Sequence, residues 1–229
     1  MLLLNRGSGR DPPVGPAIGS ALGREGRALV ESYLRSCPAH RPTRIVALPR
    51  LARSLGVDSI QIKDESRRLG LGSFKALGGA YAVIRLVLEE AGRRLGRPVS
   101  AAEIQRDDVR TIAQTMTVGC ATDGNHGRSV AAGARLTGCA ATIFVHEGVS
   151  TGRAAAIAQY GARIERVGGS YDDAVAVAAE VSTRNRWVVV SDTSWKDYER
   201  IPLMVMPGYT VAIGEALDAL DRQIGRAHV

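Results

Sequence analysis

One lysine, in the stretch Gly72 to Tyr81 that reads GSFKALGGAY, is the first residue whose type suggests chemistry. Of the 30 Lys and Arg residues only three are lysines, so a basic side chain that serves as surface charge is nearly always arginine here. Arginine stays protonated in proteins, whereas lysine can present a neutral amine to a carbonyl carbon. The composition favours a role for Lys75 that depends on its amine. The alternative is a solvated lysine at the start of a helix.

A second candidate is the segment Thr122 to Arg128, TDGNHGR, which places Asp, Asn and His between two glycines. Gly124 would let the backbone come close to a flat ligand, with Asn125 as hydrogen-bond donor and acceptor and Asp123 as a candidate base. The simpler alternative is that Asp123 or Asn125 caps the following helix, since both types are preferred caps. The combination of Asp, Asn and His between two glycines favours a ligand-binding site over a simple helix cap.

Hydrophobic periodicity predicts the elements that position these residues. Residues 59–66 alternate like a strand and then turn polar, and residues 75–95 carry apolar side chains at helical spacing. Lys75 is therefore expected at the start of a helix, where backbone N–H groups and the helix dipole favour an anionic ligand.

From about residue 115 predicted strands alternate with predicted helices, which indicates an α/β fold with a parallel sheet and right-handed crossovers. The predicted strands are around Cys120 and at 140–146, 162–168 and 187–195, and the predicted helices are at 125–138, 151–161 and 170–184. Ligands of such sheets bind beyond the carboxyl ends of the strands. The polar residues expected there are Asp64, Asp123, Asn125, His126, His146 and Asp192.

The bulk composition argues against several classes of protein. The net charge of +7 would suit a nucleic-acid partner, but the arginines are spread along the whole chain and aromatic residues make up 4%. Three cysteines without a CxxC pair suit a reducing cytoplasm, and four scattered histidines argue against a metal site. The apolar start MLLL is too short for a signal peptide, and no segment is long enough to span a membrane.

Four segments together resemble one known family. They are KDESRRLGLGSFKALGGAYAV, ATDGNHGRSVA, GGSYDDAV and VVVSDTSWKDYERIPLMVMPGY, in the family's order over roughly residues 40 to 220. In them the chain resembles diaminopropionate ammonia-lyase, a pyridoxal-phosphate enzyme of the tryptophan synthase β-like fold, also called fold type II. The resemblance implies parallel sheets with helices on both faces, two domains and a homodimer.

The resemblance also implies roles for individual residues. Lys75 matches the lysine that carries pyridoxal 5'-phosphate, and Gly124 and Asn125 match the loop that contacts the cofactor ring. Asp123 and Asp192 match two bases that act on opposite substrate enantiomers. A tyrosine near the substrate matches Tyr171, and no metal is implied.

The implied reaction is the α,β-elimination of the small amino acid 2,3-diaminopropionate to pyruvate and ammonia. Two alternatives remain open: a lyase similar to serine/threonine dehydratase, and a non-catalytic binding module with the same fold. The paired aspartates Asp123 and Asp192 favour the first reading over the dehydratase, and the presence of Lys75 argues against the binding module.

The same comparison divides the chain into regions. They are a loosely ordered lead-in (1–43), the first part of the large domain with the lysine helix (44–110), a smaller βα domain (111–195), the start of the return to the large domain (196–221) and a non-native tail (222–229). Family members continue beyond this point with a glycine-rich phosphate loop. We therefore expect the C-terminal part of the large domain to be missing, and the 229-residue chain alone to bind cofactor weakly and to be nearly inactive.

Overall fold

A four-stranded parallel sheet forms the centre of the structure, a computed structural model that describes residues 15–35, 37 and 39–219. The strand order is β5-β4-β3-β6. The strands are β3 (Thr117–Ala121), β4 (Ala140–His146), β5 (Arg163–Val167) and β6 (Val188–Val189). Residues 141–145 of β4 are all buried, as expected for a central strand covered on both faces.

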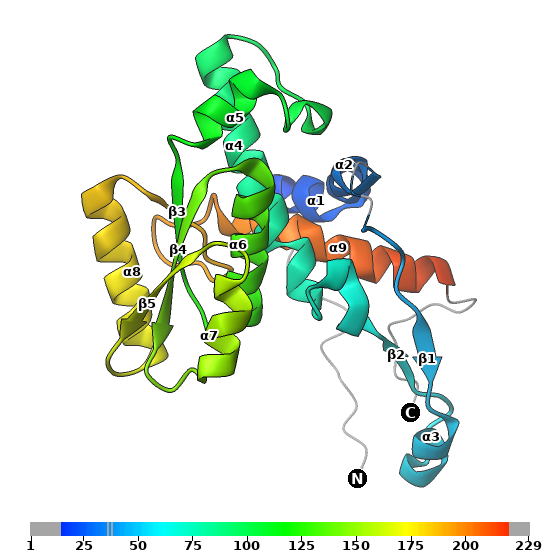
Figure 1. Cartoon of the computed structure of the whole chain (residues 1–229). Helices are drawn as coiled ribbons and strands as arrows, with labels where there is room; N and C mark the ends of the chain where they lie inside the picture. Colours follow the sequence, from blue (N-terminus) through cyan, green and yellow to red (C-terminus); the bar gives the residue numbers. More distant parts are fainter. Residues whose placement is uncertain (1–14, 36, 38, 220–229) are drawn as a thin grey trace.

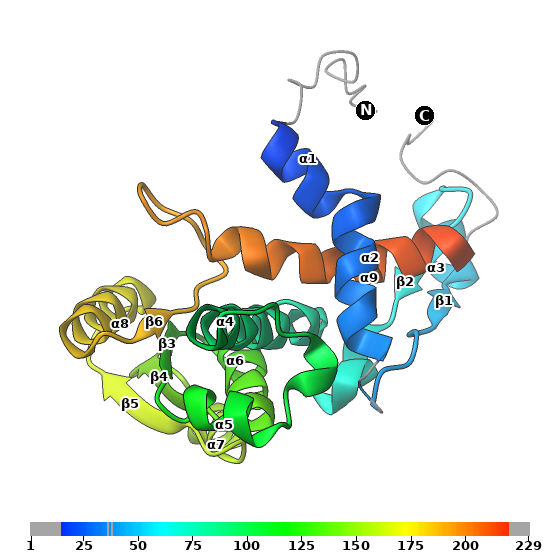
Figure 2. The same ribbon diagram turned by 90° about the horizontal axis from the view of Figure 1, so that it is seen from above.

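Helices cover both faces of this sheet (Figures 1 and 2). Helices α6 (Asn125–Thr137) and α7 (Thr151–Ala158) lie on one face, and α8 (Tyr171–Asn185) lies on the other. Helix α4 (Gly79–Leu95) packs on the outer side of α6. The approach is close, because a Cβ atom added to Gly133 would lie 2.8 Å from the Cα atom of Ala80.

Helix α4 therefore joins the lysine segment to the sheet, although the two are predicted to belong to different domains. Beside its far end lie η3 (Ala101–Glu103) and α5 (Asp107–Ala113), whose Val109 and Ile112 are buried in the main core. The domain boundaries stay predictions.

The long helix α9 (Pro202–Ala219) carries the N-terminal helices α1 (Pro16–Leu22) and α2 (Arg24–Arg35). Val30 and Leu34 of α2 are buried with Val211 of α9 in a second core cluster. Residues 16–22 and 24–35 of the predicted lead-in are thus helical and pack against α9. The apolar face of α2 packs against residues far away in the sequence, namely Leu77, Tyr81 and Val211.

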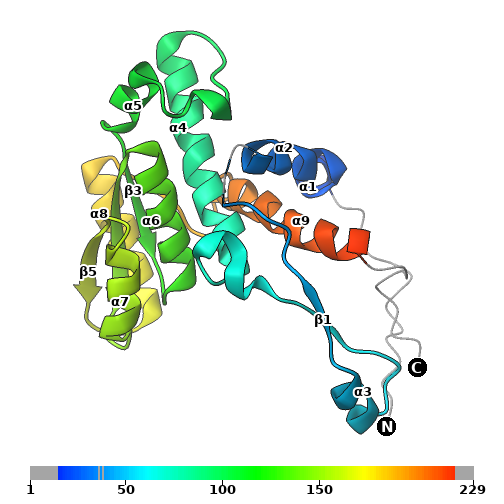
Figure 3. The same cartoon turned by 45° about the vertical axis from the view of Figure 1, so that its right-hand side comes forward.

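A small extension projects away from the sheet (Figure 3). It consists of β1 (Ile45–Ala47), which pairs antiparallel with β2 (Gln61–Lys63), and of α3 (Pro49–Leu55) between them. The predicted strand at 59–66 is confirmed over its central residues and then gives way to the 3-10 helix η1 (Glu65–Gly70).

Lys75 lies in a second 3-10 helix, η2 (Phe74–Leu77), one turn ahead of α4 rather than in its first turn. The Ser73 hydroxyl accepts a hydrogen bond from the Lys75 amide at 3.1 Å, which fixes this turn locally. The α-helix starts only at Gly79. The Ser73 cap of η2 thereby holds the backbone of Lys75 in place before α4 begins.

The other predicted elements from residue 115 onward are confirmed, with one difference. The last strand, predicted over 187–195, is only β6, because the chain leaves the sheet after Val190. There the Tyr198 hydroxyl accepts a hydrogen bond from the Ser191 amide at 2.9 Å and donates one to the Val189 carbonyl at 2.8 Å. Asp192 therefore lies in a loop.

No helix in the described part of the chain is both long and apolar enough to cross a membrane. Within the same ranges no cluster of His, Cys, Asp or Glu side chains could hold a metal ion. The predicted non-native tail at 222–229 lies outside the described residues, as do residues 1–14 of the predicted lead-in.

Candidate active site

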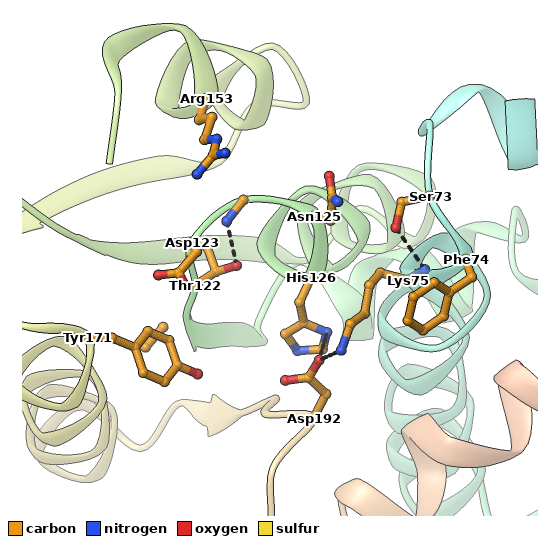
Figure 4. Close-up of a pocket in the computed structure, with 12 residues that line it drawn as sticks. Ser73, Phe74, Lys75, Thr122, Asp123, Asn125, His126, Arg153, Tyr171 and Asp192 are labelled. Atoms are coloured by element: carbon orange, nitrogen blue, oxygen red, sulfur yellow. Dashed lines mark hydrogen bonds and ion pairs between the residues drawn. The ribbon is translucent and has the colours of Figure 1, made fainter. Parts of the chain in front are cut away.

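A cleft of about 510 Å³ opens at the carboxyl ends of strands β3 and β6 (Figure 4). Its walls come from η2, from the loop between β3 and α6, from α7 and α8, and from the loop after β6. The lining residues are Ser73, Phe74, Lys75, Ala121, Thr122, Asp123, Gly124, Asn125, His126, Arg153, Tyr171 and Asp192. All six site residues that the sequence predicted, Lys75, Asp123, Gly124, Asn125, Tyr171 and Asp192, are in this cleft.

The loop before α6 is shaped by a residue outside the predicted set. The Thr122 hydroxyl accepts hydrogen bonds from the amides of Gly124 and Gly127, each at 3.0 Å. Gly124 has φ 153° and ψ −78°, a conformation that needs glycine. Neither Asp123 nor Asn125 caps the helix, so the simple capping alternative is not what the structure has. Their side chains are left to line the cleft.

Lys75 and Asp192 form an ion pair at the bottom of the cleft. The Lys75 side chain is 31% exposed and that of Asp192 is 12% exposed. Lys75 Nζ also lies 5.5 Å from the ring centre of Phe74 and 5.6 Å from that of Tyr209. The amine is thus held between a carboxylate and two aromatic faces, with an open side toward the cleft.

His126 lies behind this ion pair and is buried. Its Nε2 is 2.9 Å from the carbonyl oxygen of Val190, and its Nδ1 is 3.6 Å from Oδ2 of Asp192. Since a carbonyl only accepts, Nε2 carries the proton and Nδ1 presents a lone pair. Within the described residues Nδ1 has no hydrogen-bond partner.

The charges around Asp192 and His126 set their protonation. Burial pushes the pKa of Asp192 up, but the nearby His126 and Lys75 outweigh it, and the pKa lies below its usual range. Burial lowers the pKa of His126, so that its imidazole is neutral near pH 7. Since a neutral imidazole carries no charge, Lys75 is the one of these two neighbours whose charge favours the ionised Asp192 carboxylate near pH 7.

Asp123 and Tyr171 lie on the other side of the cleft from Lys75. The Asp123 side chain is 63% exposed and bonds His146 Nε2 at 3.1 Å. Burial raises the pKa of Tyr171, and the carboxylates of Asp192 and Asp123 add to this effect, so the phenol stays neutral. The two aspartates thus differ in setting, since the side chain of Asp192 is 12% exposed and lies beside the amine, whereas that of Asp123 is 63% exposed.

Two further groups in the cleft have no side-chain partner in the described part of the chain. The Asn125 amide makes no hydrogen bond there, and the Arg153 guanidinium points into the cleft from α7 (Figure 4). A Cβ atom added at Gly124 would lie 3.8 Å from Cδ of Arg153 and near nothing else, so the backbone is open at this point.

A lysine at the bottom of a cleft beyond parallel strands, faced by a glycine-rich asparagine loop, defines a class of cofactor-dependent α/β enzymes. The chain belongs to the family of pyridoxal-phosphate dependent enzymes, which it matches over residues 37–227. The fold is that of the fold type II members of this family.

Several relatives are known by name. The chain is 36% identical over 197 residues to diaminopropionate ammonia-lyase of Escherichia coli strain K12, covering 86% of this chain and 48% of that protein. The crystal structure of the Escherichia coli enzyme in complex with D-serine superposes with a TM-score of 0.78 and 34% identity, covering 89% of this chain and 50% of that one. A probable D-serine dehydratase of Rhizobium etli is 24% identical over 227 residues, covering 93% of this chain and 49% of that protein. The chain thus spans about half the length of the curated relatives that it matches.

The residues present fit pyridoxal 5'-phosphate, a flat aromatic aldehyde with a phosphate group. Lys75 offers an amine for the aldehyde, Asn125 an unused amide for a polar ring substituent, and Gly124 an open stretch of backbone. The volume of the cleft lies within the usual range for cofactor sites.

Sequence reasoning missed six lining residues: Ser73, Phe74, Ala121, Thr122, His126 and Arg153. His126 was placed at a strand end by its position but given no role. Its contact with Asp192 crosses from α6 to the loop after β6, which no local pattern reveals.

Proposed function

We propose that this chain supplies the lysine-bearing cleft of a lyase that eliminates ammonia from 2,3-diaminopropionate. The observation that carries the proposal is the presence of Lys75, Asp123 and Asp192 in one cleft. Identity of 36% to a diaminopropionate ammonia-lyase supports the choice of substrate. The overall reaction would convert diaminopropionate and water to pyruvate and two molecules of ammonia.

Lys75 would hold the cofactor by its aldehyde, with Asn125 bonding the ring and the backbone at Gly124 close to it. When bound, pyridoxal phosphate supplies the electron sink that stabilises negative charge at the α-carbon of the substrate. Lys75 then has to give up Asp192 as its partner, because an amine engaged with the cofactor no longer donates as an ammonium group.

The two aspartates would remove the α-proton, each from a substrate of one handedness. Asp192 would act from the loop after β6, once Lys75 has released it, and Asp123 from the α6 loop with His146 as its partner. Tyr171, neutral and facing both carboxylates, would contact the substrate. A pair of bases in one cleft would give a single enzyme access to both D- and L-diaminopropionate.

A dehydratase is the second candidate, and the relationship to a probable D-serine dehydratase favours it. It would use the same lysine, with a hydroxyl in place of the β-amino group as leaving group. The third reading, a binding module that keeps the fold without the reaction, is disfavoured by Lys75. The resemblance further supports a homodimer in the cytoplasm; the free thiols of Cys37, Cys120 and Cys139 suit a reducing compartment.

The test is release of the 2-oxo acid by the gene product, which is pyruvate from D- and L-diaminopropionate and from D- and L-serine, and 2-oxobutyrate from threonine. Diaminopropionate should be the better substrate in both forms, and Lys75→Ala should abolish turnover and the visible band that appears on adding pyridoxal phosphate. Lys196→Ala is the matched control, since Lys196 is exposed and outside the cleft. Faster turnover of serine than of diaminopropionate would overturn the proposal in favour of a dehydratase.

The 229-residue chain should be assayed on its own in the same series. We expect it to bind pyridoxal phosphate weakly and to release almost no pyruvate. Full turnover by this chain would contradict that expectation while leaving the proposed reaction intact.

A further inference from the structure

His126 is a buried titratable group in the cleft that the reaction above leaves unused. It lies on the first turn of α6, next to the Lys75–Asp192 pair (Figure 4). Its two ring nitrogens have different surroundings. Nε2 is fixed by the Val190 carbonyl at 2.9 Å, and Nδ1 is buried with no hydrogen-bond partner among the residues that the structure describes.

The unpartnered nitrogen is directed at one atom. Nδ1 lies 3.6 Å from Asp192 Oδ2, the same oxygen that Lys75 bonds. When the imidazole carries its proton on Nε2, Nδ1 and the ionised carboxylate of Asp192 are both acceptors, so no hydrogen bond can join them. A buried nitrogen that accepts no hydrogen bond destabilises the fold, so the position of Nδ1 calls for an explanation.

A hydrogen bond between Asp192 and His126 becomes possible once Asp192 takes up a proton. The new O–H group on Oδ2 has an acceptor waiting at Nδ1, and a short movement closes the gap to a hydrogen bond. The step needs no other reactant: the C–H bond of the substrate breaks, its electron pair stays with the substrate, and the proton ends on Oδ2.

We propose that His126 is a positioning residue for Asp192, with Nδ1 as the acceptor that receives the proton-bearing Oδ2 after Asp192 has acted as a base. The inference rests on the proposed role of Asp192. It predicts that His126 supports only the half of the reaction that uses Asp192. Asp123, which bonds His146 instead, is independent of it.

Two substitutions separate this role from a purely structural one. In His126→Gln the side-chain amide reaches the position of Nε2 and keeps a donor for Val190, but nothing replaces Nδ1. In His126→Asn the amide lies where Nδ1 was and offers a carbonyl acceptor to Asp192, while the Val190 contact is lost. The first variant should be the more stable of the two and the second the more active.

The first experiment uses the 229-residue chain without cofactor. Spectra of ¹⁵N-labelled histidine at pH 7 should show His126 with a proton on Nε2 and none on Nδ1. In Lys75→Met, where the ammonium partner of Asp192 is gone, a proton shared between Oδ2 and Nδ1 should appear, and it should disappear in Lys75→Met/Asp192→Asn. Persistence of the Nε2–H signal in each variant confirms that the fold is kept. An Nδ1 signal that does not respond to Lys75→Met would overturn the inference.

The second experiment measures turnover of both enantiomers by the gene product. His126→Gln should lower kcat about tenfold, the value of one neutral hydrogen bond, for the enantiomer that Asp192→Asn abolishes, and should leave the other unchanged. Equal losses for both enantiomers, or activity that follows stability across the Gln and Asn variants, would count against a role toward Asp192. If Asp192→Asn lowers turnover of both enantiomers equally, the proposed role of Asp192 as the base for one enantiomer is wrong. The histidine spectra then still test whether His126 Nδ1 contacts Asp192.

Discussion

Lys75 and Asp192 form an ion pair inside the cleft although 117 residues separate them in the chain. Lys75 arrives on a 3-10 turn that α9 covers, and Asp192 on the loop that leaves the sheet after β6. The pair therefore ties the lysine segment to the carboxyl end of the sheet. Because the side chains are 31% and 12% exposed, loss of either partner leaves a partly buried charge without its counter-charge.

Asparagine at each aspartate should give opposite enantiomer profiles. Asp192→Asn and Asp123→Asn each keep the shape of the side chain but remove the base, so each should lower kcat for one enantiomer of diaminopropionate by at least about 10²-fold. Pyruvate release from the separated enantiomers is the measurement.

The two variants should also differ in stability, which provides an internal control. Asp192→Asn leaves Lys75 unpaired in the cleft and should lower the free energy of unfolding by roughly 1–3 kcal/mol. Asp123→Asn should have almost no effect, since its side chain is 63% exposed. Parallel losses for both enantiomers in both variants would refute the assignment of two bases.

A buried ion-pair network, away from the cleft, should make stability depend on pH. Arg68 is buried and bonds both oxygens of Glu215, with Nη1 to Oε1 at 2.9 Å and Nη2 to Oε2 at 2.7 Å. Lys63 Nζ lies 2.7 Å from the same carboxylate. Although burial works against the charge, these partners lower the pKa of Glu215 from 4.5 to about 2.

A depressed carboxyl pKa stabilises the fold at pH values above the unfolded pKa and loses this effect as pH falls toward the folded value. The shift corresponds to about 3 kcal/mol, fully present above about pH 5 and lost between there and about pH 2. Glu215→Gln should lower the free energy of unfolding by about that much at pH 7, measured by urea denaturation.

The difference between the natural chain and Glu215→Gln should shrink steadily as pH falls below 4.5. Glu180→Gln is the control, because Glu180 also pairs with an arginine on its helix but both side chains are about two-thirds exposed. Its effect should stay below about 0.5 kcal/mol at every pH. A constant difference for Glu215→Gln from pH 7 to pH 3 would show that the carboxylate charge is not what stabilises the network.

Much of the sheet layer could be predicted because its signals are local. The apolar run 140–146 became β4 with the same bounds, and Gly138 ends α6 in a left-handed conformation as its position suggested. The alternation of strands and helices predicted a parallel sheet, and the carboxyl ends of parallel strands meet at one edge. The site residues lie together for this reason.

Features set by distant contacts could not be predicted in this way. Val30 of α2 packs in one cluster with Val211 of α9, and Arg68 bonds Glu215, which lies 147 residues away in the sequence. The choice between helix cap and site at TDGNHG was decided by Thr122, whose hydroxyl caps the helix in place of the neighbouring aspartate and asparagine. Each of these depends on which partner the fold supplies, which composition and periodicity do not contain.

Removal of the Thr122 hydroxyl should loosen the cofactor loop. Thr122→Val keeps the shape but leaves the amides of Gly124 and Gly127 without their acceptor, so the free energy of unfolding should fall by about 1–2 kcal/mol. Thr122→Ser keeps the hydroxyl and should cost less than Val. Hydrogen exchange at Gly124 and Gly127 is the direct measurement, and equal protection in Val and Ser variants would refute the role of the hydroxyl.

A methyl group at Gly208 should disturb the segment that carries Lys75. A Cβ atom there would collide with the Leu77 carbonyl oxygen and lie 2.8 Å from the Cα atom of Gly78, both in backbone that cannot move aside cheaply. Gly208→Ala should therefore push α9 away from η2 and lower the free energy of unfolding by about 1–3 kcal/mol, despite the better helix propensity of alanine.

Gly152→Ala is the matched control, because Gly152 is also helical and a Cβ atom there would meet nothing within 4 Å. It should raise stability by up to about 1 kcal/mol. Since Gly208 faces the turn of Lys75 while Gly152 does not, only Gly208→Ala should also weaken the absorbance band formed with pyridoxal phosphate. Equal stability changes of the same sign in the two variants would mean that the close approach of α9 to the lysine segment does not constrain it.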